Sequence, residues 1–190
     1  MSDAATSAPA TITLLIDRAN SGNAEALNAL FATLYPELHA LAHARIRRNR
    51  QLTLLDTTAL LHESYLRFVR LGQLNVGNRA HFLAYAARTM RSIVVDFARA
   101  RLAQRRGGGG DDAILDTDAA LAGTGEEEVI RVHEALDELR HADERLVRVV
   151  EMRYFGGLTE DEIGSALGIT DRTVRRMWDK ARVMLEVALR

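Results

Sequence analysis

The chain has 190 residues, no cysteine, two prolines and a formal net charge of −1, with 47% hydrophobic residues. This length suits one or two domains, and the lack of cysteine excludes disulfides, thiolate metal sites and a cysteine nucleophile. The first ten residues lack a basic stretch followed by an apolar core, and no apolar run approaches the roughly 20 residues of a membrane helix. We therefore expect a cytoplasmic protein without membrane contact.

The small net charge hides a division along the chain. Residues 1–110 carry 14 Arg against 7 acidic residues, whereas residues 111–190 carry 11 basic against 19 acidic residues. Such asymmetry is typical of a chain with a nucleic-acid surface in one part and an acidic element in another.

Helical periodicity dominates the chain, and no alternating strand pattern occurs. The pattern predicts helices over residues 12–19, 24–47, 57–71, 78–105, 126–139, 143–154, 160–167 and 171–189. Pro36 lies inside the second of these and is expected to bend it. The predicted fold class is all-α, with two helical domains.

The predicted helix over residues 78–105 has two distinct faces. At about 100° per residue, its apolar residues share one arc: Leu83, Ala86, Met90, Ile93, Val94 and Phe97. The opposite arc holds Arg88, Arg91, Ser92, Asp96 and Arg99, with Phe82 and Tyr85 at its border. Arginines interleaved with aromatic rings suit single-stranded nucleic acid. A solvated basic face, with the border aromatics in the core, explains the pattern equally well.

A linker separates the two helical blocks. Residues 107–110 are four glycines, and residues 111–128 contain seven acidic residues and no basic one. Such a segment has little to bury and is expected to be flexible. The 19 residues 107–125 would span roughly 24 Å, which lets two domains occupy separate surfaces.

Residues 158–182 have the pattern of a helix-turn-helix. Thr159 and Glu162 form a predicted capping box at the start of the first helix. Gly168 suits the left-handed position that ends this helix, and Thr170 suits the N-cap of the next. The small Gly164 lies where the two helices must cross closely. In a DNA-binding helix-turn-helix the second helix enters the major groove.

The second helix of this motif separates apolar from basic residues. The apolar set falls within about 120°: Val174, Met177, Trp178, Ala181, Met184, Leu185 and Ala188. Because Arg can bridge the two acceptors of guanine, the predicted base readers are Arg172, Thr173, Arg175 and Arg176. Lys180 and Arg182 are predicted to contact phosphate. The alternative is a helical hairpin with a solvated basic face.

No catalytic constellation occurs in the sequence. His39 and His43 have an i, i+4 spacing that could hold a metal, but no third ligand accompanies them. His62 and Glu63 are adjacent on a helix, so their side chains diverge. We expect a protein that is not an enzyme and that has no metal site and no cofactor.

Three segments together resemble a known family. Residues 56–67 (DTTALLHESYLR), residues 82–99 with FLAYAAR and DFAR, and residues 158–182 occur in the order found in extracytoplasmic-function (ECF) sigma factors, a class of the sigma-70 family. The resemblance covers residues 11–190. It implies a domain at 11–106 that binds the clamp helices of core RNA polymerase and melts the promoter −10 element. It also implies a linker at 107–125 and a helix-turn-helix domain at 126–190 that binds the −35 element.

The resemblance assigns roles to individual residues. Residues implied to bind core polymerase are Asp56, Thr57, Thr58, Leu60, Leu61, Glu63 and Arg67. Those implied to contact the −10 element are Asn78, Arg79, His81, Phe82, Tyr85, Arg88, Arg91, Ser92 and Arg99. Those implied to contact the −35 element are Thr170, Arg172, Thr173, Arg175, Arg176 and Lys180. The implied partners are core polymerase (clamp helices and flap), promoter DNA, and an anti-sigma factor or a Ser/Thr kinase as regulator.

One segment departs from the family pattern. Where family members carry several acidic residues, this chain has Asp56 followed by Thr57 and Thr58. Our hypothesis is that phosphorylation of either threonine restores the missing negative charge near a helix N-terminus. The alternative is that Thr58 is an N-cap residue and other contacts compensate.

Two other classes of protein fit parts of the sequence. A stand-alone helix-turn-helix regulator would bind duplex operator DNA without polymerase, with the N-terminal block as a ligand or dimerisation domain. A helical scaffold with a degenerate basic face is the weaker alternative.

Overall fold

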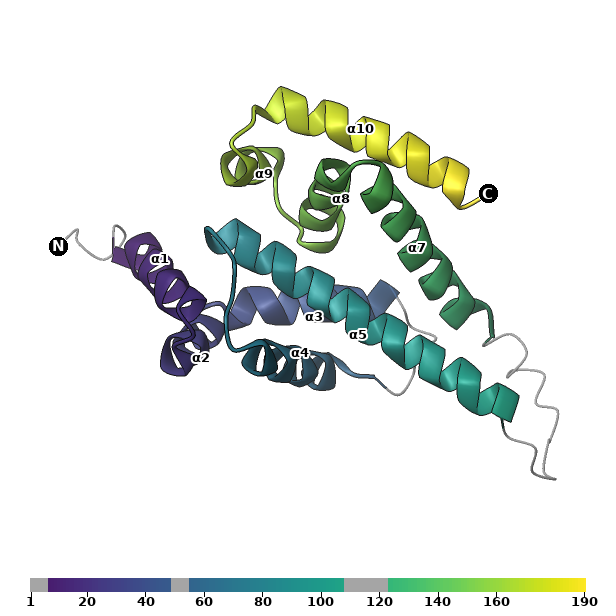
Figure 1. The fold of residues 1–190 in the computed structure, drawn as a ribbon, viewed down its shortest axis with the longest axis horizontal. Helices are drawn as coiled ribbons and strands as arrows, with labels where there is room; N and C mark the ends of the chain where they lie inside the picture. Colours follow the sequence, from purple (N-terminus) through teal and green to yellow (C-terminus); the bar gives the residue numbers. More distant parts are fainter. Residues whose placement is uncertain (1–6, 49–54, 108–122) are drawn as a thin grey trace.

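The computed structural model describes residues 7–48, 55–107 and 123–190, and within these ranges all regular secondary structure is helical (Figure 1). The first half contains α1 (Ser7–Asn20), α2 (Ala24–Thr33), α3 (Tyr35–Arg48), α4 (Thr57–Leu71) and α5 (Arg79–Gly107). The second half contains α7 (Gly123–Ala142), α8 (Glu144–Val150), the π-helical segment η1 (Glu151–Phe155), α9 (Glu160–Leu167) and α10 (Asp171–Ala188). None of these helices is long and apolar enough to cross a membrane. Most of the predicted linker lies outside the described residues.

The helix predicted over residues 24–47 is two helices, α2 and α3. The break is at Leu34, which caps the C-terminus of α2. Pro36 is the second residue of α3. Backbone N–H groups in the first turn of a helix have no intrahelical acceptor, so a proline that lacks an N–H costs nothing there. The prediction of one bent helix was therefore wrong, because Pro36 begins a new helix.

Three phenylalanines form the centre of the first half. The rings of Phe31 and Phe68 meet edge to face with centroids 5.0 Å apart, and Phe82 lies 5.7 Å from Phe31 and 5.6 Å from Phe68. Edge-to-face aromatic pairs add about 0.5–1.5 kcal/mol beyond the area that they bury. These contacts join α2, α4 and α5 into one core.

A π-helical segment interrupts the helix that the sequence predicts over residues 143–154. The N–H of Gly156 donates to the carbonyl oxygen of Glu151 at 2.8 Å, which closes a wide i→i+5 turn. A Cβ at Gly156 would lie 2.6 Å from the carbonyl oxygen of Met152, so the tight backbone requires glycine. Glu151, Met152 and Phe155 of this segment are buried. Such segments occur frequently at functional sites.

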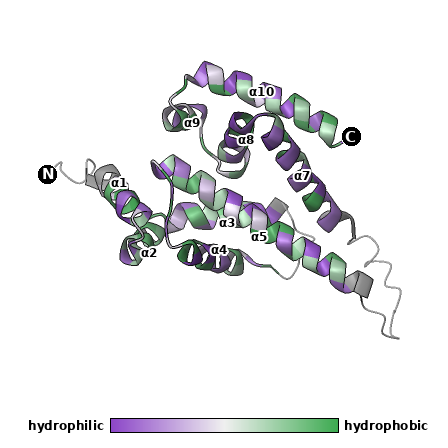
Figure 2. Cartoon of the chain, in the orientation of Figure 1, coloured by the Kyte–Doolittle hydropathy of each residue, from purple (hydrophilic) through white to green (hydrophobic). Residues whose placement is uncertain are grey.

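The two halves of the chain pack against one another through α5. Helix α5 contacts α3 and α4 of the first half and α7 and η1 of the second. In Figure 1 the second-half helices lie above α5 and α4 lies below it, while α3 overlaps α5 in this view. One cluster of buried residues contains side chains of both halves, among them Leu83 from the first half and Met152, Leu158 and Ile163 from the second. Figure 2 shows hydrophilic and hydrophobic residues alternating along α5 and α10, as expected of helices with one buried face.

Candidate nucleic-acid interface

The turn between α9 and α10 has the local geometry that the sequence predicts. The N–H of Thr159 donates to Oε2 of Glu162 at 2.9 Å, and the N–H of Glu162 donates to Oγ1 of Thr159 at 3.3 Å. Gly168 ends α9 with φ of 65°, a left-handed conformation that favours glycine. Thr170 caps α10 by accepting the N–H of Thr173 at 3.2 Å. These features hold α10 at a defined angle to α9.

Gly164 lies at the closest approach between α9 and the turn. A Cβ at this position would lie 2.8 Å from the carbonyl oxygen of Ile169, a backbone atom that cannot move cheaply. The prediction that a small residue is needed at this crossing is confirmed.

The outer face of α10 is basic and open to solvent. Val174 and Ala181 are buried in the core, whereas the basic residues on the other face are exposed. The exposed set is Arg172, Arg175, Arg176, Lys180 and Arg182. Thr173 is half-buried, and Arg153 lies over the Trp178 ring, 4.8 Å from its centroid. The basic residues can thus reach a ligand that approaches α10.

Arg175 is held by a carboxylate of the preceding helix. Its Nη2 donates to Oε2 of Glu160 at 2.7 Å and its Nε donates to the same atom at 3.1 Å. The other oxygen of Glu160 accepts a hydrogen bond from Arg153 at 2.7 Å. The hydrogen bonds from Arg175, with a smaller contribution from Arg153, lower the pKa of Glu160. Glu160 is therefore a carboxylate at neutral pH and fixes the direction of Arg175.

The basic face predicted on α5 is only partly open. Arg88 and Arg99 are exposed, and Arg79 and Ser92 are half-buried. Arg91 is only 5% exposed, so its predicted place on a solvated face was wrong. Its Nη2 donates to Oε1 of Glu151 in the second half at 3.0 Å. A helical wheel places Arg91 on the polar side of α5 but carries no information on which element covers that side.

The aromatic residues at the border of this face lie in the first-half core. Phe82 is 0% exposed, so its ring is not available to stack on a base in this conformation. Tyr85 is half-buried, with its ring centroid 5.1 Å from that of Phe68. For Phe82 the alternative is therefore correct, in which the aromatic residues at the border lie in the core, because its ring packs with those of Phe31 and Phe68.

The loop before α5 is anchored at both ends. Asn78 caps α5, with its Oδ1 accepting the N–H of His81 at 2.9 Å. Asn20 at the end of α1 donates to the carbonyl oxygen of Val76 at 2.8 Å and accepts the N–H of Val76 at 3.2 Å. Sequence reasoning did not single out Asn20, because its partner lies 56 residues away.

A hollow of about 540 Å³ adjoins this loop. Gly77, His81, Tyr85 and Arg88 line it from the first half, and the second half lines its other side, Glu151 included. Burial, and to a lesser extent the positive charge of Arg148, lowers the pKa of His81. His81 is consequently neutral at physiological pH.

The residues singled out on α4 divide into a cap, a buried face and an ionic cluster. Asp56 is the N-cap, accepting the N–H of Ala59 at 2.7 Å. The alternative that Thr58 caps the helix was therefore wrong; Thr58 is exposed within the first turn and Thr57 is half-buried. Leu60 and Leu61 are buried in the core, which leaves them inaccessible to a partner in this conformation.

Charged residues connect α4 to α5. Arg67 donates to Asp96 at 2.6 Å and to the hydroxyl of Ser92 at 3.1 Å. Glu63 lies 3.9 Å from Arg67 and 4.0 Å from Arg70. Arg67 therefore has a structural partner on α5, and Glu63 remains half-buried at the edge of α4.

The two histidines of α3 are exposed and stack on one another. The rings of His39 and His43 are 6.5 Å apart and nearly parallel. Within the described part of the chain, no group of three side chains is arranged to hold a metal ion.

The sequence matches a known protein family over almost the whole chain. The model described as ECF sigma factor (Sigma70_ECF) matches residues 9–190. The chain belongs to the ECF sigma factor family. As a sigma factor it acts in transcription initiation, and members of this family associate with RNA polymerase core, promoter DNA and anti-sigma factors. No curated protein and no solved structure matches this sigma factor significantly.

Proposed function

We propose that this sigma factor directs core polymerase to specific promoters, reading duplex −35 DNA with α10 and trapping melted −10 bases beside α5. The observation that carries the proposal is the exposed basic face of α10, held by the capped turn at Gly168. A helix placed this way can enter a major groove and present Arg172, Thr173, Arg175 and Arg176 to base edges. Thr170 and Lys180 lie at the flanks of that surface and suit phosphate contacts.

Support for the −10 role comes from the surroundings of the loop before α5. Arg88 and Arg99 provide exposed positive charge along α5, and Tyr85 provides a partly accessible ring. Single-stranded nucleic acid is bound by this combination of cationic and aromatic groups. We assign melting and −10 capture to residues 11–106 and −35 binding to residues 126–190.

We further propose that phosphorylation of Thr57 or Thr58 strengthens the contact between α4 and core polymerase. The first turn of α4 contains no acidic residue, and Thr58 is exposed there. A phosphate adds about −1.5 to −2 charges and is favoured near a helix N-terminus.

For the protein as a whole, we propose a non-catalytic mechanism that uses no cofactor. We also propose that the protein acts in the cytoplasm.

Reconstituted transcription tests the main proposal. Purified core polymerase plus this chain should produce promoter-specific transcripts that neither component produces alone. Arg176→Ala should reduce the preference among −35 variants, whereas Arg131→Ala, which removes an exposed arginine of α7, should not. Binding of duplex DNA without any transcription would overturn the proposal and support a stand-alone regulator.

Binding to core polymerase tests the phosphorylation proposal. Thr57→Glu and Thr58→Glu should bind core more tightly than the unaltered chain. Thr33→Glu adds the same charge at an exposed position of α2 and should have no effect. If neither α4 variant binds core more tightly, threonine phosphorylation is not the switch.

A further inference from the structure

One carboxylate of the second half, that of Glu151, lies close to three arginines. Oε1 of Glu151 lies 3.0 Å from Nη2 of Arg91, 3.5 Å from Nη2 of Arg140 and 3.9 Å from Nε of Arg88. The side chain of Glu151 is only 8% exposed. A buried charge is tolerated only when it is paired and hydrogen-bonded, so Glu151 and Arg91 depend on each other.

Two of the three arginines that face Glu151 belong to α5 and are among the residues assigned to the −10 element, whereas Arg140 belongs to α7. These two, Arg88 and Arg91, are part of the −10 surface, which we define as the α5 residues assigned to the −10 element. An anionic oxygen surrounded by guanidinium groups is in the environment that a DNA phosphate would occupy. Glu151 is the first residue of η1, which packs against α5. Glu151 therefore satisfies the positive charge of α5 in the absence of nucleic acid.

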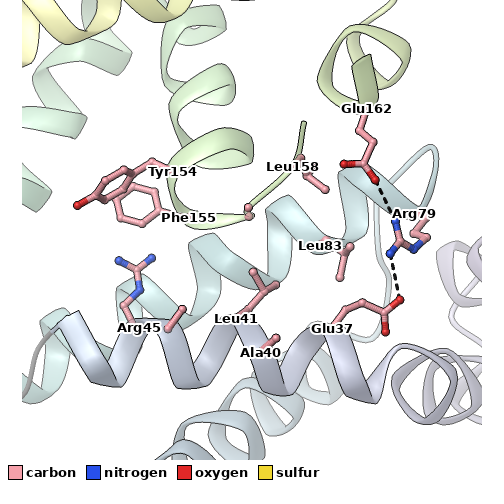
Figure 3. Close-up of a pocket in the computed structure, with 13 residues that line it drawn as sticks. Glu37, Ala40, Leu41, Arg45, Arg79, Leu83, Tyr154, Phe155, Leu158 and Glu162 are labelled. Atoms are coloured by element: carbon pink, nitrogen blue, oxygen red, sulfur yellow. Dashed lines mark hydrogen bonds and ion pairs between the residues drawn. The ribbon is translucent and has the colours of Figure 1, made fainter. Parts of the chain in front are cut away.

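Two more acidic residues of the second half pair with arginines of α5. Arg79 lies 3.7 Å from Glu162 and 3.0 Å from Glu37, and Figure 3 shows it bridging α9 and α3. Arg101 lies 3.4 Å from the fully buried Glu126. Pairs thus occur along most of the length of α5, from its first turn to its C-terminal part.

Apolar and cation–π contacts close the same interface. Leu158 and Phe155 of the second half face Leu83 and Arg45 of the first across a hollow of about 340 Å³ (Figure 3). The guanidinium of Arg45 lies 4.1 Å from the centroid of the Phe155 ring. The interface therefore combines charge pairing with burial.

We propose that the free chain is closed on itself, with Glu151 occupying the place of a promoter phosphate on α5. The closed form covers Arg91 and part of the −10 surface, so DNA contact requires the second half to move away from α5. Interaction of core polymerase with both halves would stabilise the open form. The identity of the competing ligand rests on the proposed function, whereas the closed contact itself does not.

A distance measurement tests the closed contact without DNA or polymerase. The chain contains no cysteine, so Ala29→Cys on α2 and Val183→Cys on α10, both exposed, place two spin labels at known positions. The free chain should give one dominant, narrow peak in its distance distribution. Glu151→Gln should broaden it and shift it to longer distances, because Arg91 then loses its ionic partner. Glu144→Gln removes an acid whose partner Arg148 lies on the same helix, and it should leave the distribution unchanged.

A DNA-binding measurement tests whether the closed contact covers a nucleic-acid surface on α5. A fluorescent single-stranded oligonucleotide of mixed sequence serves as the probe at low salt. If the open fraction is about one tenth in the unaltered chain, full opening by Glu151→Gln tightens apparent binding about tenfold. The Glu144→Gln variant has the same net charge and controls for non-specific attraction.

The outcomes separate the two proposals. A distribution that is broad in the unaltered chain, or unchanged by Glu151→Gln, overturns the closed form. Longer distances without tighter DNA binding support the closed form and overturn the assignment of α5 as a nucleic-acid surface. If circular dichroism shows that Glu151→Gln fails to fold, Glu162→Gln makes the same test. Glutamine keeps the capping box with Thr159 but removes the charge that faces Arg79.

Discussion

Nη1 of Arg91 lies 2.7 Å from Nδ1 of His133, so a guanidinium of α5 donates to a ring nitrogen of α7. Nδ1 can accept this hydrogen bond only when the imidazole is neutral. Nε2 of His133 then carries the proton and lies 3.3 Å from Oδ2 of Asp137. His133 thus bridges a cation of the first half and an anion of the second, and sequence reasoning did not single it out.

Acidification should open the closed form through His133. Burial, and next the charge of Arg91, lowers the pKa of His133; Arg99 and Arg140 add to this and Asp137 opposes it. Glu151 also faces Arg91 from η1. A histidine with a lowered pKa stabilises the closed form fully above about pH 6.5, its ordinary value, and loses that contribution as the pH falls through the lowered pKa.

Label distances between Ala29→Cys and Val183→Cys should therefore lengthen between pH 7.5 and pH 5.5. His81, whose pKa is also lowered, acts in the same direction. A His133→Gln, His81→Gln double variant should show no change over this range, since glutamine at 133 can still accept from Arg91 and donate to Asp137. Equal distances at both pH values in the unaltered chain would contradict the prediction.

Alanine at Gly164 should destabilise the second half. The added Cβ would lie 2.8 Å from the carbonyl oxygen of Ile169, so α9 and the turn must separate. Overpacking of this kind costs about 1–3 kcal/mol in the free energy of unfolding. Urea denaturation followed by circular dichroism measures the loss. Ser165→Ala, at the next and exposed position of α9, should be nearly neutral. Alanine has a higher helix propensity than glycine or serine, so propensity alone would stabilise both variants. A Gly164→Ala variant that is as stable as the unaltered chain, or more stable, would contradict the crowding.

The features that sequence reasoning predicted well are those set by neighbouring residues. The bounds of α4 and α9 agree with prediction because Asp56, Thr159 and the glycines that follow each helix mark their ends locally. The closing turn at Gly168 is likewise determined by the residues within it.

The features that sequence reasoning missed depend on residues that are far apart in the chain. Arg91 looks like a solvated arginine until Glu151, 60 residues later, is brought beside it. Phe82 looks like an accessible ring until Phe31 and Phe68 converge on it. Periodicity tells which side of a helix is polar, but tertiary packing decides what covers that side.

Asp56 should have separable structural and binding roles. Its Oδ1 accepts the N–H of Ala59 at 2.7 Å, a bond that asparagine can also make and alanine cannot. Asp56→Ala should therefore lower the free energy of unfolding by about 1 kcal/mol, whereas Asp56→Asn should change it little. If the carboxylate contacts core polymerase, both variants should bind core more weakly. Asp17→Asn, on the exposed side of α1, controls for net charge. Unchanged core binding by Asp56→Asn would limit Asp56 to the structural role.

Arg175 is assigned to base edges, but once released from Glu160 its side chain should also be able to neutralise a neighbouring phosphate in duplex DNA. Glu160 holds Arg175 through two hydrogen bonds, and charge-assisted bonds are roughly twice as strong as neutral ones, so Glu160→Gln loosens Arg175. Each additional neutralised phosphate steepens the slope of log K against log salt by about 0.9. Titration of a −35 duplex at several salt concentrations measures this slope.

Asp161→Asn provides the matched control for this prediction. It makes the same change in net charge one residue further along α9, at an exposed position. A general increase in positive potential would steepen the slope equally in both variants. A steeper slope in Glu160→Gln alone shows that the carboxylate restrains Arg175 specifically, and equal slopes in the two variants would refute that restraint.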